Sequence, residues 1–298
     1  MTIPAGDGPL LGAVEAGGTK FVLAIGTASG KVLASHRLPT TTPAETLAAA
    51  ADWFSAQPPL AAIGIGSFGP AVLDPASPHY GRITDTPKPG WSDCDIAGHF
   101  ARRFGVPIGF DTDVNGAALG EYLHGAGKAG QSLAYVTVGT GIGGGLVIGG
   151  EPVHGGAHPE MGHLFPRRPA GDTVFAGTCP FHGDCLEGLA SGPAIKARWG
   201  APLDQLPAGH EAHAIVADYL AQLCHTLFAL TAVETIVLGG GVSQAPGLVE
   251  RVRRRSAELS AGYLPGGKRH AVVAPGLGQN AGIVGALVLA ARAIAQSS

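Results

Sequence analysis

Charge of either sign is scarce in this sequence. Only 14% of the 298 residues are charged, and the formal net charge at pH 7 is -3. A protein that binds nucleic acid normally carries a basic excess, so this balance argues against a nucleic-acid partner. The one basic run, residues 251–255 (RVRRR), lies in a segment with a helical pattern and is interpreted as the solvated face of a helix.

Long hydrophobic runs are scarce as well. Residues 1–10 lack the cationic stretch and apolar core that characterise a secretory signal. The longest apolar run, residues 281–291, contains two glycines and is too short to span a bilayer, so it predicts a core helix. We therefore expect a cytoplasmic protein with no membrane partner.

Cysteine is rare, with four residues in the chain. Without a visible export signal, this number argues against a disulfide framework. Cys94 and Cys224 stand alone and are interpreted as packing or surface thiols. Cys179 and Cys185 instead flank the stretch CPFHGDC, which with His182 places three potential metal ligands within seven residues.

Glycine, by contrast, is abundant at 48 residues, and an internal repeat of glycine-tipped hairpins accounts for part of it. Residues 11–25 (LGAVEAGGTKFVLAI) and 133–148 (LAYVTVGTGIGGGLVI) each pair two apolar strands through a glycine turn. Further short strands at 61–66, 107–110 and 234–238 alternate with helical patterns. We therefore expect an α/β fold of two similar halves that face each other.

Three glycine turns indicate a ligand that carries phosphates, because backbone N–H groups approach oxygens most closely where no Cβ intervenes. The first turn lacks the order of a Walker loop, and either hairpin tip alone could be only a turn. Together the turns predict contacts to the β- and γ-phosphates of ATP. The residues concerned are Gly17, Gly18, Thr19 and Lys20 in the first turn, Thr140, Gly141, Gly143 and Gly144 in the second, and Gly239, Gly240 and Gly241 in the third.

Two carboxylates follow the strand at 107–110 and open a helical segment. Asp111 and Asp113 stand where α/β folds collect ligands, at the C-terminal end of a strand. We expect one of them to cap the helix and the other to act as a base. Other helices are predicted at 41–53, where Thr42 is the expected cap, and at 215–230, with an irregular loop at 70–91.

The motifs EAGGTK, TDVNGAALGE, VGTGIGGGLVIGG, HPEMGH and CPFHGDC occur in an order and at a spacing that resemble the ROK family of sugar kinases, most closely its bacterial zinc-containing fructokinases. The resemblance covers about residues 11–289. It implies an actin-like or hexokinase-like ATPase fold with two βββαβαβα halves around a central cleft. The expected domains are residues 1–115, completed by a C-terminal helix in 281–298, and residues 116–280 with a zinc loop at 163–185.

The same resemblance assigns roles to single residues. Asp113 takes the place of the catalytic base. Thr112 stands where many glucose-specific members have Asn, which favours fructose as the substrate. Glu15 stands where many relatives have Asp and is expected to reach Mg²⁺ through water. The residues expected to contact or border the sugar are Gly66, Thr112, Asn115, Glu160, His163 and Glu187.

For the metal, the resemblance makes His163 the fourth ligand beside Cys179, His182 and Cys185, with His154 and His158 as rivals. Two thiolates and two imidazoles close a tetrahedral shell around Zn²⁺, which is typical of a structural site. The loops that carry Glu160 and Glu187 would thereby be tied together. Zinc removal is consequently expected to damage sugar affinity more than nucleotide affinity.

The function implied by the resemblance is the ATP- and Mg²⁺-dependent phosphorylation of D-fructose at its 6-hydroxyl. The alternative enzyme is a glucokinase, a mannokinase or a broad hexokinase, although family glucokinases usually have a Cys-x-Cys-Gly-x-x-Gly-Cys zinc loop that this sequence lacks. A sugar-sensing regulator of the same family is the non-enzyme alternative. It is disfavoured because the first hairpin begins near Leu11 and leaves no room for a helix-turn-helix. A homodimer is expected, since relatives are commonly dimers.

Overall fold

The computed structural model describes residues 8–169, 172 and 174–297, and its chain divides into two compact units. The first comprises Met1–Gly125, Pro152–His158 and Gln279–Ser298, and the second comprises Ala126–Glu151 and Pro159–Gly278. The boundary expected at residue 115 falls inside helix α3 (Asp113–His124), and all of α3 belongs to the first unit.

The first unit contains a mixed five-stranded sheet in the order β3-β2-β1-β4-β5. Its strands are β1 (Leu11–Ala16), β2 (Lys20–Gly26), β3 (Val32–Pro39), β4 (Ala62–Ser67) and β5 (Ile108–Thr112). Strands β1, β2 and β3 form antiparallel pairs, whereas β4 and β5 run parallel to β1. With helices α1 (Pro43–Ser55), α2 (Ile96–Phe104) and α3, the chain order is the predicted βββαβαβα.

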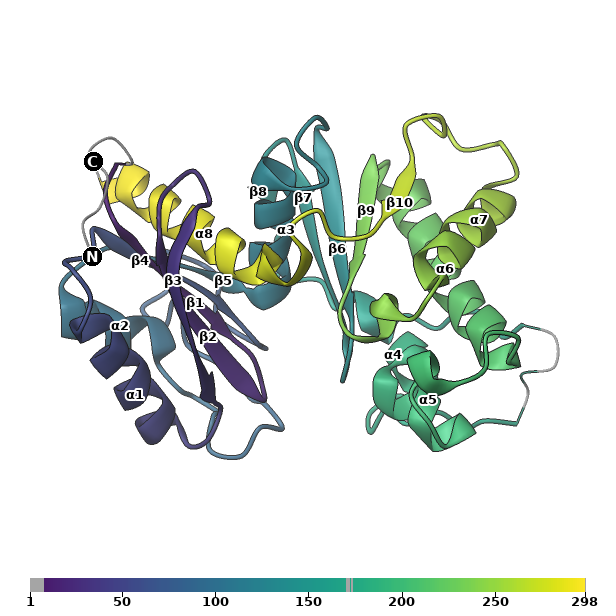
Figure 1. Cartoon of the computed structure of the whole chain (residues 1–298), viewed down its shortest axis with the longest axis horizontal. Coiled ribbons are helices and arrows are strands. Elements are labelled where there is room, and N and C mark those ends of the chain that lie inside the picture. The colour runs from purple at the N-terminus through teal and green to yellow at the C-terminus, as the bar shows by residue number, and fades with distance from the viewer. Residues whose placement is uncertain (1–7, 170–171, 173, 298) are drawn as a thin grey trace. The chain divides into compact units, whose positions relative to one another are not determined.

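Helices cover both faces of this sheet (Figure 1). Helices α1 and α2 bury Leu47, Phe54 and Phe100 against the strands in one apolar core. The opposite face packs on α8 (Ala281–Ser297), as expected for a C-terminal core helix. The approach is close, because a Cβ on Gly64 of β4 would lie 1.8 Å from the carbonyl oxygen of Ala286.

Helix α1 begins where the sequence predicts. Thr42 is the N-cap, and its Oγ1 accepts a hydrogen bond from the backbone N–H of Glu45 at 3.4 Å. The same hydroxyl donates to Glu45 Oε2 at 2.9 Å. The residues before the helix therefore satisfy one of its free N–H groups, which is the expected stabilisation of a helix start.

The second unit repeats this plan. Its sheet has the order β10-β9-β6-β7-β8, with strands β6 (Ser132–Val138), β7 (Ile142–Ile148), β8 (Glu151–Pro152), β9 (Thr235–Gly239) and β10 (Ala271–Val273). The β6–β7 pair is antiparallel, and β9 runs parallel to β6, as β4 does to β1. The predicted hairpin repeat is confirmed. The helices are α4 (Leu186–Ala190), α5 (Gly192–Trp199), α6 (Glu211–Thr231) and α7 (Leu248–Ser260), and short 3₁₀ turns comprise η1 (Met161–His163), η2 (Leu203–Gln205), η3 (Val242–Gln244) and η4 (Gly278–Asn280).

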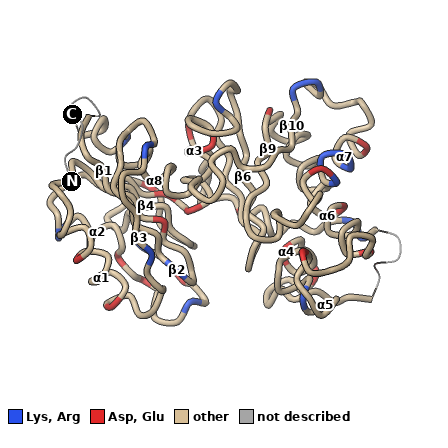
Figure 2. Tube along the Cα trace, viewed as in Figure 1, with Lys and Arg blue, Asp and Glu red and all other residues tan. Residues whose placement is uncertain are grey.

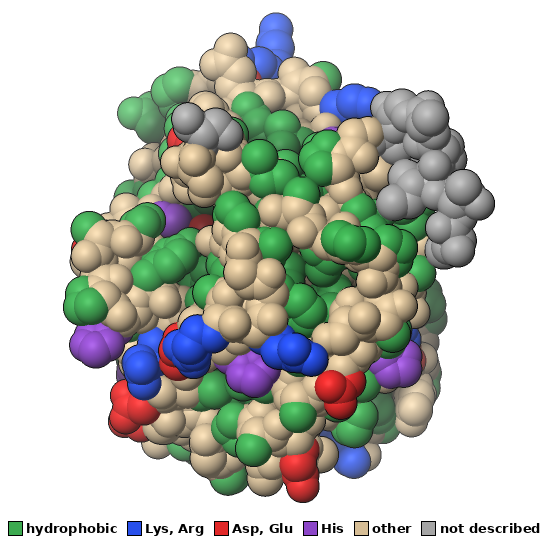
Figure 3. All heavy atoms as spheres, turned by 90° about the vertical axis from the view of Figure 1, so that its left-hand side faces the viewer, with side chains coloured by type: hydrophobic (Ala, Val, Ile, Leu, Met, Phe, Trp, Pro, Cys, Tyr) green, Lys and Arg blue, Asp and Glu red, His purple; other side chains and the backbone are tan. Residues whose placement is uncertain are grey.

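The basic run forms part of α7, where acidic residues accompany it (Figure 2). Arg253 pairs with Glu250 at 2.7 Å, and Arg255 pairs with Asp218 at 2.5 Å. On the face of the molecule in Figure 3, basic and acidic side chains of the described residues are likewise interspersed. The basic run is therefore accompanied by carboxylates that pair with its arginines at the surface.

Two helical segments are long and apolar enough to cross a membrane by length and composition alone. They are Glu211–Thr231 and Gly278–Ser297, and the most apolar window of each is 50% and 56% buried within the protein, respectively. A core helix passes the same test. The packing of α8 on β1, β4 and β5 gives that apolar surface a partner inside the first unit.

Candidate functional site

The junction between β5 and α3 carries the predicted catalytic carboxylate. Thr112 is the N-cap of α3, and its Oγ1 accepts a hydrogen bond from the backbone N–H of Asn115 at 3.1 Å. The expectation that Asp111 or Asp113 caps this helix was therefore wrong. Asp113 occupies the first turn, is half-buried, and accepts a hydrogen bond from the N–H of Val114 at 2.9 Å. A carboxylate is stabilised at this position by the helix dipole.

Asp111, the last residue but one of β5, is buried, with 3% of its surface exposed. Its Oδ1 accepts hydrogen bonds from the N–H of Thr112 at 2.7 Å and from Asn115 Nδ2 at 2.8 Å. Its Oδ2 lies 3.0 Å from His154 Nε2. The hydrogen bond to Asp111 raises the pKa of His154, against the opposing effect of burial. His154 is therefore engaged with Asp111.

Gly66 and Glu15 lie on neighbouring strands of the same sheet. A Cβ on Gly66 would lie 3.3 Å from the Cα of Asp113, so this glycine borders the backbone of the predicted catalytic residue. Burial raises the pKa of Glu15, while Lys20 and Arg37 lower it to a smaller extent. A Cβ on Gly282 would lie 2.6 Å from Glu15 Cδ, which places the Glu15 carboxyl group against the first turn of α8.

The first glycine turn joins β1 to β2. Thr40 braces it, because its Oγ1 donates to the carbonyl oxygen of Gly17 at 2.7 Å and its N–H donates to that of Thr19 at 3.0 Å. Gly18 has open space around its Cα, while Thr19 and Lys20 are exposed. The tip is therefore held at its base and accessible at its end, as a phosphate-binding turn requires.

The second and third glycine turns meet at one cavity in the second unit. Its volume is about 420 Å³, and Thr140 and Gly241 contribute to its wall. The third turn requires glycine, because Gly240 has a φ of +85° and a Cβ there would lie 2.4 Å from the Val138 carbonyl oxygen. The full lining is Gly139, Thr140, Gly192, Pro193, Pro202, Leu203, Asp204, Gly241 and Val242. Sequence reasoning missed Gly192, Pro193 and residues 202–204, which belong to no glycine turn and carry no recognisable motif.

Helix α4 reaches the second hairpin through Glu187. Glu187 Oε2 accepts a hydrogen bond from the N–H of Ile142 at 2.9 Å, and a Cβ on Gly141 would lie 2.5 Å from the same oxygen. At the start of α5, the N–H of Gly192 donates to the Gly139 carbonyl oxygen at 2.8 Å. Gly143 and Gly144 follow in β7, where a Cβ on Gly144 would lie 2.3 Å from Met161 Sδ.

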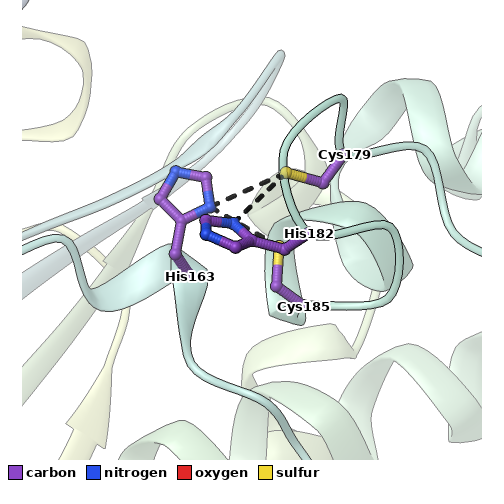
Figure 4. Close-up of side chains that lie close together, drawn as sticks. All are labelled: His163, Cys179, His182 and Cys185. Carbon is purple, nitrogen blue, oxygen red and sulfur yellow. Dashed lines mark hydrogen bonds between the residues drawn. The ribbon is translucent and has the colours of Figure 1, made fainter.

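His163, Cys179, His182 and Cys185 converge on one point (Figure 4). One ligand atom from each lies within 4.8 Å of the others. The Cys179 sulfur is 3.9 Å from His163 Nδ1 and 3.7 Å from His182 Nδ1, and the Cys185 sulfur is 3.5 Å from His163 Nδ1. A tetrahedral Zn²⁺ shell, with Zn–S of about 2.3 Å and Zn–N of about 2.0–2.1 Å, implies S···N separations of about 3.6 Å. The donor set and its spacing fit zinc.

The rivals for the fourth position lie elsewhere. His154 contacts Asp111, and His158 approaches Gly69, where a Cβ would lie 3.1 Å from His158 Nε2. Of these three candidates for the fourth ligand, His163 is the one that lies in the cluster with Cys179, His182 and Cys185. Burial, followed by the neighbouring Cys179 thiol, raises the pKa of Cys185. A bound dication would reverse that effect by stabilising the thiolate.

The backbone builds this cluster with tight turns. Cys179 and Gly183 exchange backbone hydrogen bonds at 3.2 and 2.9 Å, and Gly183 has a φ of +61°. The 3₁₀ turn with Glu160 before it and His163 at its end packs on β7, since a Cβ on Gly162 would lie 1.9 Å from the Ile142 carbonyl oxygen. The N–H of Leu186 donates to the Leu164 carbonyl oxygen at 2.8 Å, so the backbone directly after CPFHGDC is joined to the backbone directly after HPEMGH.

A model of the ROK family matches residues 11–293. The chain belongs to the ROK family. It is 49% identical over 295 residues to a fructokinase from Zymomonas mobilis, covering 96% of this chain and 98% of that protein. It is 44% identical over 286 residues to a fructokinase from Pediococcus pentosaceus, covering 96% and 99%. The structure of this ROK member resembles that of a ROK glucokinase from Streptomyces griseus in complex with glucose and AMPPNP, with a TM-score of 0.74, 27% identity, and coverage of 95% of this chain and 99% of that one. The fold is accordingly the expected hexokinase-like α/β fold.

Proposed function

We propose that the protein is an ATP-dependent fructokinase that converts D-fructose to fructose 6-phosphate. The observation that carries this proposal is the identity of 49% to a fructokinase over nearly the whole of both chains. Two features of the structure support it. The first unit supplies Asp113 and the second supplies a cavity between two glycine turns.

Asp113 is the proposed catalytic base. A neutral hydroxyl is a poor nucleophile, and a carboxylate within hydrogen-bond reach both orients it and accepts its proton. As a bond forms between the sugar 6-oxygen and the γ-phosphorus, the bond from that phosphorus to the β–γ bridging oxygen breaks, and ADP leaves. The N–H of Val114 donates to Asp113 Oδ1 and holds the carboxylate at the start of α3.

The glycine turns are the proposed nucleotide site. The N–H groups of Gly17, Gly139 and Ile142 donate within the protein. Other backbone N–H groups of the turns 17–20, 139–144 and 239–241 would donate to phosphate oxygens, with Lys20 as a positive counter-charge. The cavity lined by Thr140, Leu203 and Gly241 supplies an apolar and polar wall for the rest of the nucleotide. Mg²⁺ bound together with ATP would neutralise negative charge on the phosphoryl group that is transferred.

The sugar contacts are proposed for Glu160, His163 and Glu187, with Gly66 at the border. His163 serves two roles without conflict, because Nδ1 faces the cysteine sulfurs and Nε2 remains on the other side of the ring. Thr112 and Asn115 are 3% and 0% exposed, so both act through the backbone junction that they hold.

Zn²⁺ is the proposed occupant of the Cys179, His182, Cys185 and His163 cluster. Four protein ligands leave no open coordination position, so the ion would be structural. Its role on this proposal is to hold the 3₁₀ turn after Glu160 against the helix that carries Glu187.

We further propose that the protein acts in the cytoplasm, as a homodimer, without a nucleic-acid or membrane partner. A glucokinase or broad hexokinase is the alternative enzyme. The deciding experiment is an ADP-release assay with fructose, mannose, glucose, glucosamine and N-acetylmannosamine at equal concentrations. We expect the highest kcat/KM for fructose, and a preference for another sugar would overturn the assignment. Sedimentation equilibrium would test the dimer.

A further inference from the structure

The contact between Asp111 and His154 joins two segments of the first unit that lie 43 residues apart in sequence. Asp111 directly precedes Thr112, the N-cap of α3. His154 belongs to the segment 152–158, which begins at the end of β8. A carboxylate can only accept a hydrogen bond, so His154 Nε2 carries the hydrogen and donates it. The pair is shielded on the Asp111 side, where the carboxylate side chain is 4% exposed.

We propose that Asp111 and His154 are positioning residues for the phosphoryl transfer, which fix the β5–α3 junction and with it the Asp113 carboxylate. This inference rests on the proposed kinase function and adds to it two residues that contact neither phosphate nor sugar. Asp113 is the half-buried carboxylate of the junction, whereas Asp111 is enclosed.

The hydrogen bonds around Asp111 show how the position of Asp113 is fixed. Asp111 receives the N–H of Thr112 and the side-chain amide of Asn115, and Thr112 in turn caps the N–H of Asn115. These three hydrogen bonds link residues 111, 112 and 115, which flank residue 113 on both sides. Residue 112 takes part in two of the bonds, and residue 115 takes part in two. Residue 113 therefore has little freedom to move unless Asp111 moves.

Asn115 supports a positioning role over a sugar contact for these three hydrogen bonds. It is fully buried, and its Oδ1 has no hydrogen-bond partner in the described part of the chain. Its amide nitrogen donates to Asp111 Oδ1 and lies 3.2 Å from His154 Nε2, so the Asn115 amide is held at the Asp111–His154 pair. A buried amide with one unmet acceptor is retained at a cost, and that cost is consistent with a requirement for the geometry it imposes.

The second consequence concerns the chain after His154. His158 approaches Gly69, so the segment 152–158 is attached to the first unit at two points four residues apart. Glu160 follows two residues after His158 in sequence. The Asp111–His154 pair therefore also restrains the chain that leads to a proposed sugar ligand.

The test compares His154→Ala, His154→Gln and the wild type in steady-state assays with fructose and ATP. His154→Ala removes the donor, and a misplaced base is expected to lower kcat by about tenfold or more. The KM for ATP should stay within about twofold, because the nucleotide contacts lie on other segments. His154→Gln keeps an N–H that can reach Asp111 and is expected to recover kcat to within about threefold of the wild type.

A control and a double variant complete the design. His36→Ala removes an exposed histidine of β3 that stacks on Trp53, and it should leave kcat unchanged. Asp111→Asn combined with His154→Ala should lose no more than the poorer single variant, since the two residues act as one unit. If His154→Ala fails to fold, as judged by its thermal transition, the Gln variant and the Asp111→Asn variant carry the comparison.

Several results would overturn the proposal. One is a kcat for His154→Ala within twofold of the wild type. Another is a kcat for His154→Gln no higher than that of His154→Ala. A third is a rise confined to the KM for fructose, which would make His154 a direct sugar ligand. Failure of the parent function is separate, because it would appear as a wild-type enzyme inactive on fructose. In that case the same comparison of kcat is made on the hexose that the wild type accepts.

Discussion

Glu187 holds the second glycine hairpin through a backbone N–H group of that hairpin. Its Oε2 accepts the N–H of Ile142 at 2.9 Å, across 45 residues of sequence, and lies where a side chain on Gly141 would otherwise be. Glu187 is also two residues after Cys185 of the proposed zinc cluster. One carboxylate therefore links the proposed zinc cluster, the proposed sugar site and a proposed nucleotide turn.

Substitution of Glu187 should separate its two roles. In Glu187→Gln the amide oxygen can still accept the Ile142 N–H, so the KM for ATP should stay within about twofold. The lost charge weakens the sugar contact, and a hydrogen bond to a charged group contributes about 1.5–3 kcal/mol, which predicts a rise in the KM for fructose of about tenfold or more. In Glu187→Ala the KM for both substrates should rise. Equal effects of Gln and Ala on the KM for ATP would show that Glu187 does not brace the hairpin.

Removal of the metal site should affect both substrates. Sequence alone predicted a loss mainly in sugar affinity, but α4 and α5 contact the hairpin at Ile142 and at Gly139. Cys179→Ser is therefore expected to lower zinc content and melting temperature, and to raise the KM for ATP as well as for fructose.

The matched control is Cys94→Ser, because Cys94 is a half-buried thiol outside the cluster. It should leave zinc content unchanged. Metal analysis of the wild-type protein, purified without chelator, should give close to one equivalent of zinc. Less than half an equivalent would contradict the proposal of a structural zinc ion. An unchanged KM for ATP in Cys179→Ser would restore the original expectation.

Local patterns made much of the fold predictable. The two hairpins were predictable because each consists of apolar strands and a glycine turn within about sixteen consecutive residues. The pairing of β1 with β2 and of β6 with β7 follows because the paired strands are adjacent in sequence. The start of helix α1 was predictable from Thr42 and Glu45, because a helix cap also depends on residues close together in sequence. The cysteine and histidine spacing in CPFHGDC likewise predicted three members of a cluster that the structure assembles.

Long-range contacts were not predictable in this way. The bonds from Glu187 to Ile142 and from His154 to Asp111 join residues more than forty positions apart, and no short motif specifies either. The cap of α3 was missed for a different reason. Asp111, Thr112 and Asp113 are all good N-cap residues, and the backbone at the end of β5 decides among them by placing Thr112 Oγ1 at the N–H of Asn115.

Glu15 provides a test by pH. Burial raises its pKa in the folded protein, whereas the unfolded chain titrates near about 4.3. Between these two pKa values the folded state keeps a proton that the unfolded state has lost, so stability falls as pH rises through the window and is constant above it. Glu15→Gln should remove this fall and raise the melting temperature at neutral pH.

The same variant tests the expected contact to Mg²⁺ through water. If Glu15 acts only against the start of α8, Glu15→Gln should keep kcat and the Mg²⁺ dependence of the wild type. A higher Mg²⁺ requirement would place Glu15 in the nucleotide site. A melting temperature that falls at every pH would contradict the proposed cost of burial.

Asp113→Asn is the decisive test of the catalytic base. The amide keeps the size of the side chain and an oxygen for the Val114 N–H, but it cannot accept the proton of the attacking hydroxyl. Loss of a general base lowers kcat by about 10²- to 10⁴-fold. Fructose affinity, measured by calorimetry on the inactive variant, should change much less, because the other sugar ligands remain.

Asp111→Asn is the comparison. It places an amide where Asn115 and His154 both donate, so one donor faces another, and we expect a smaller loss in kcat of about tenfold through misplacement of the junction. If Asp111→Asn were inactive while Asp113→Asn stayed within tenfold of the wild type, Asp111 would be the base. The position of Asp111 argues for the opposite order, because it is 3% exposed and both of its oxygens already accept hydrogen bonds within the protein.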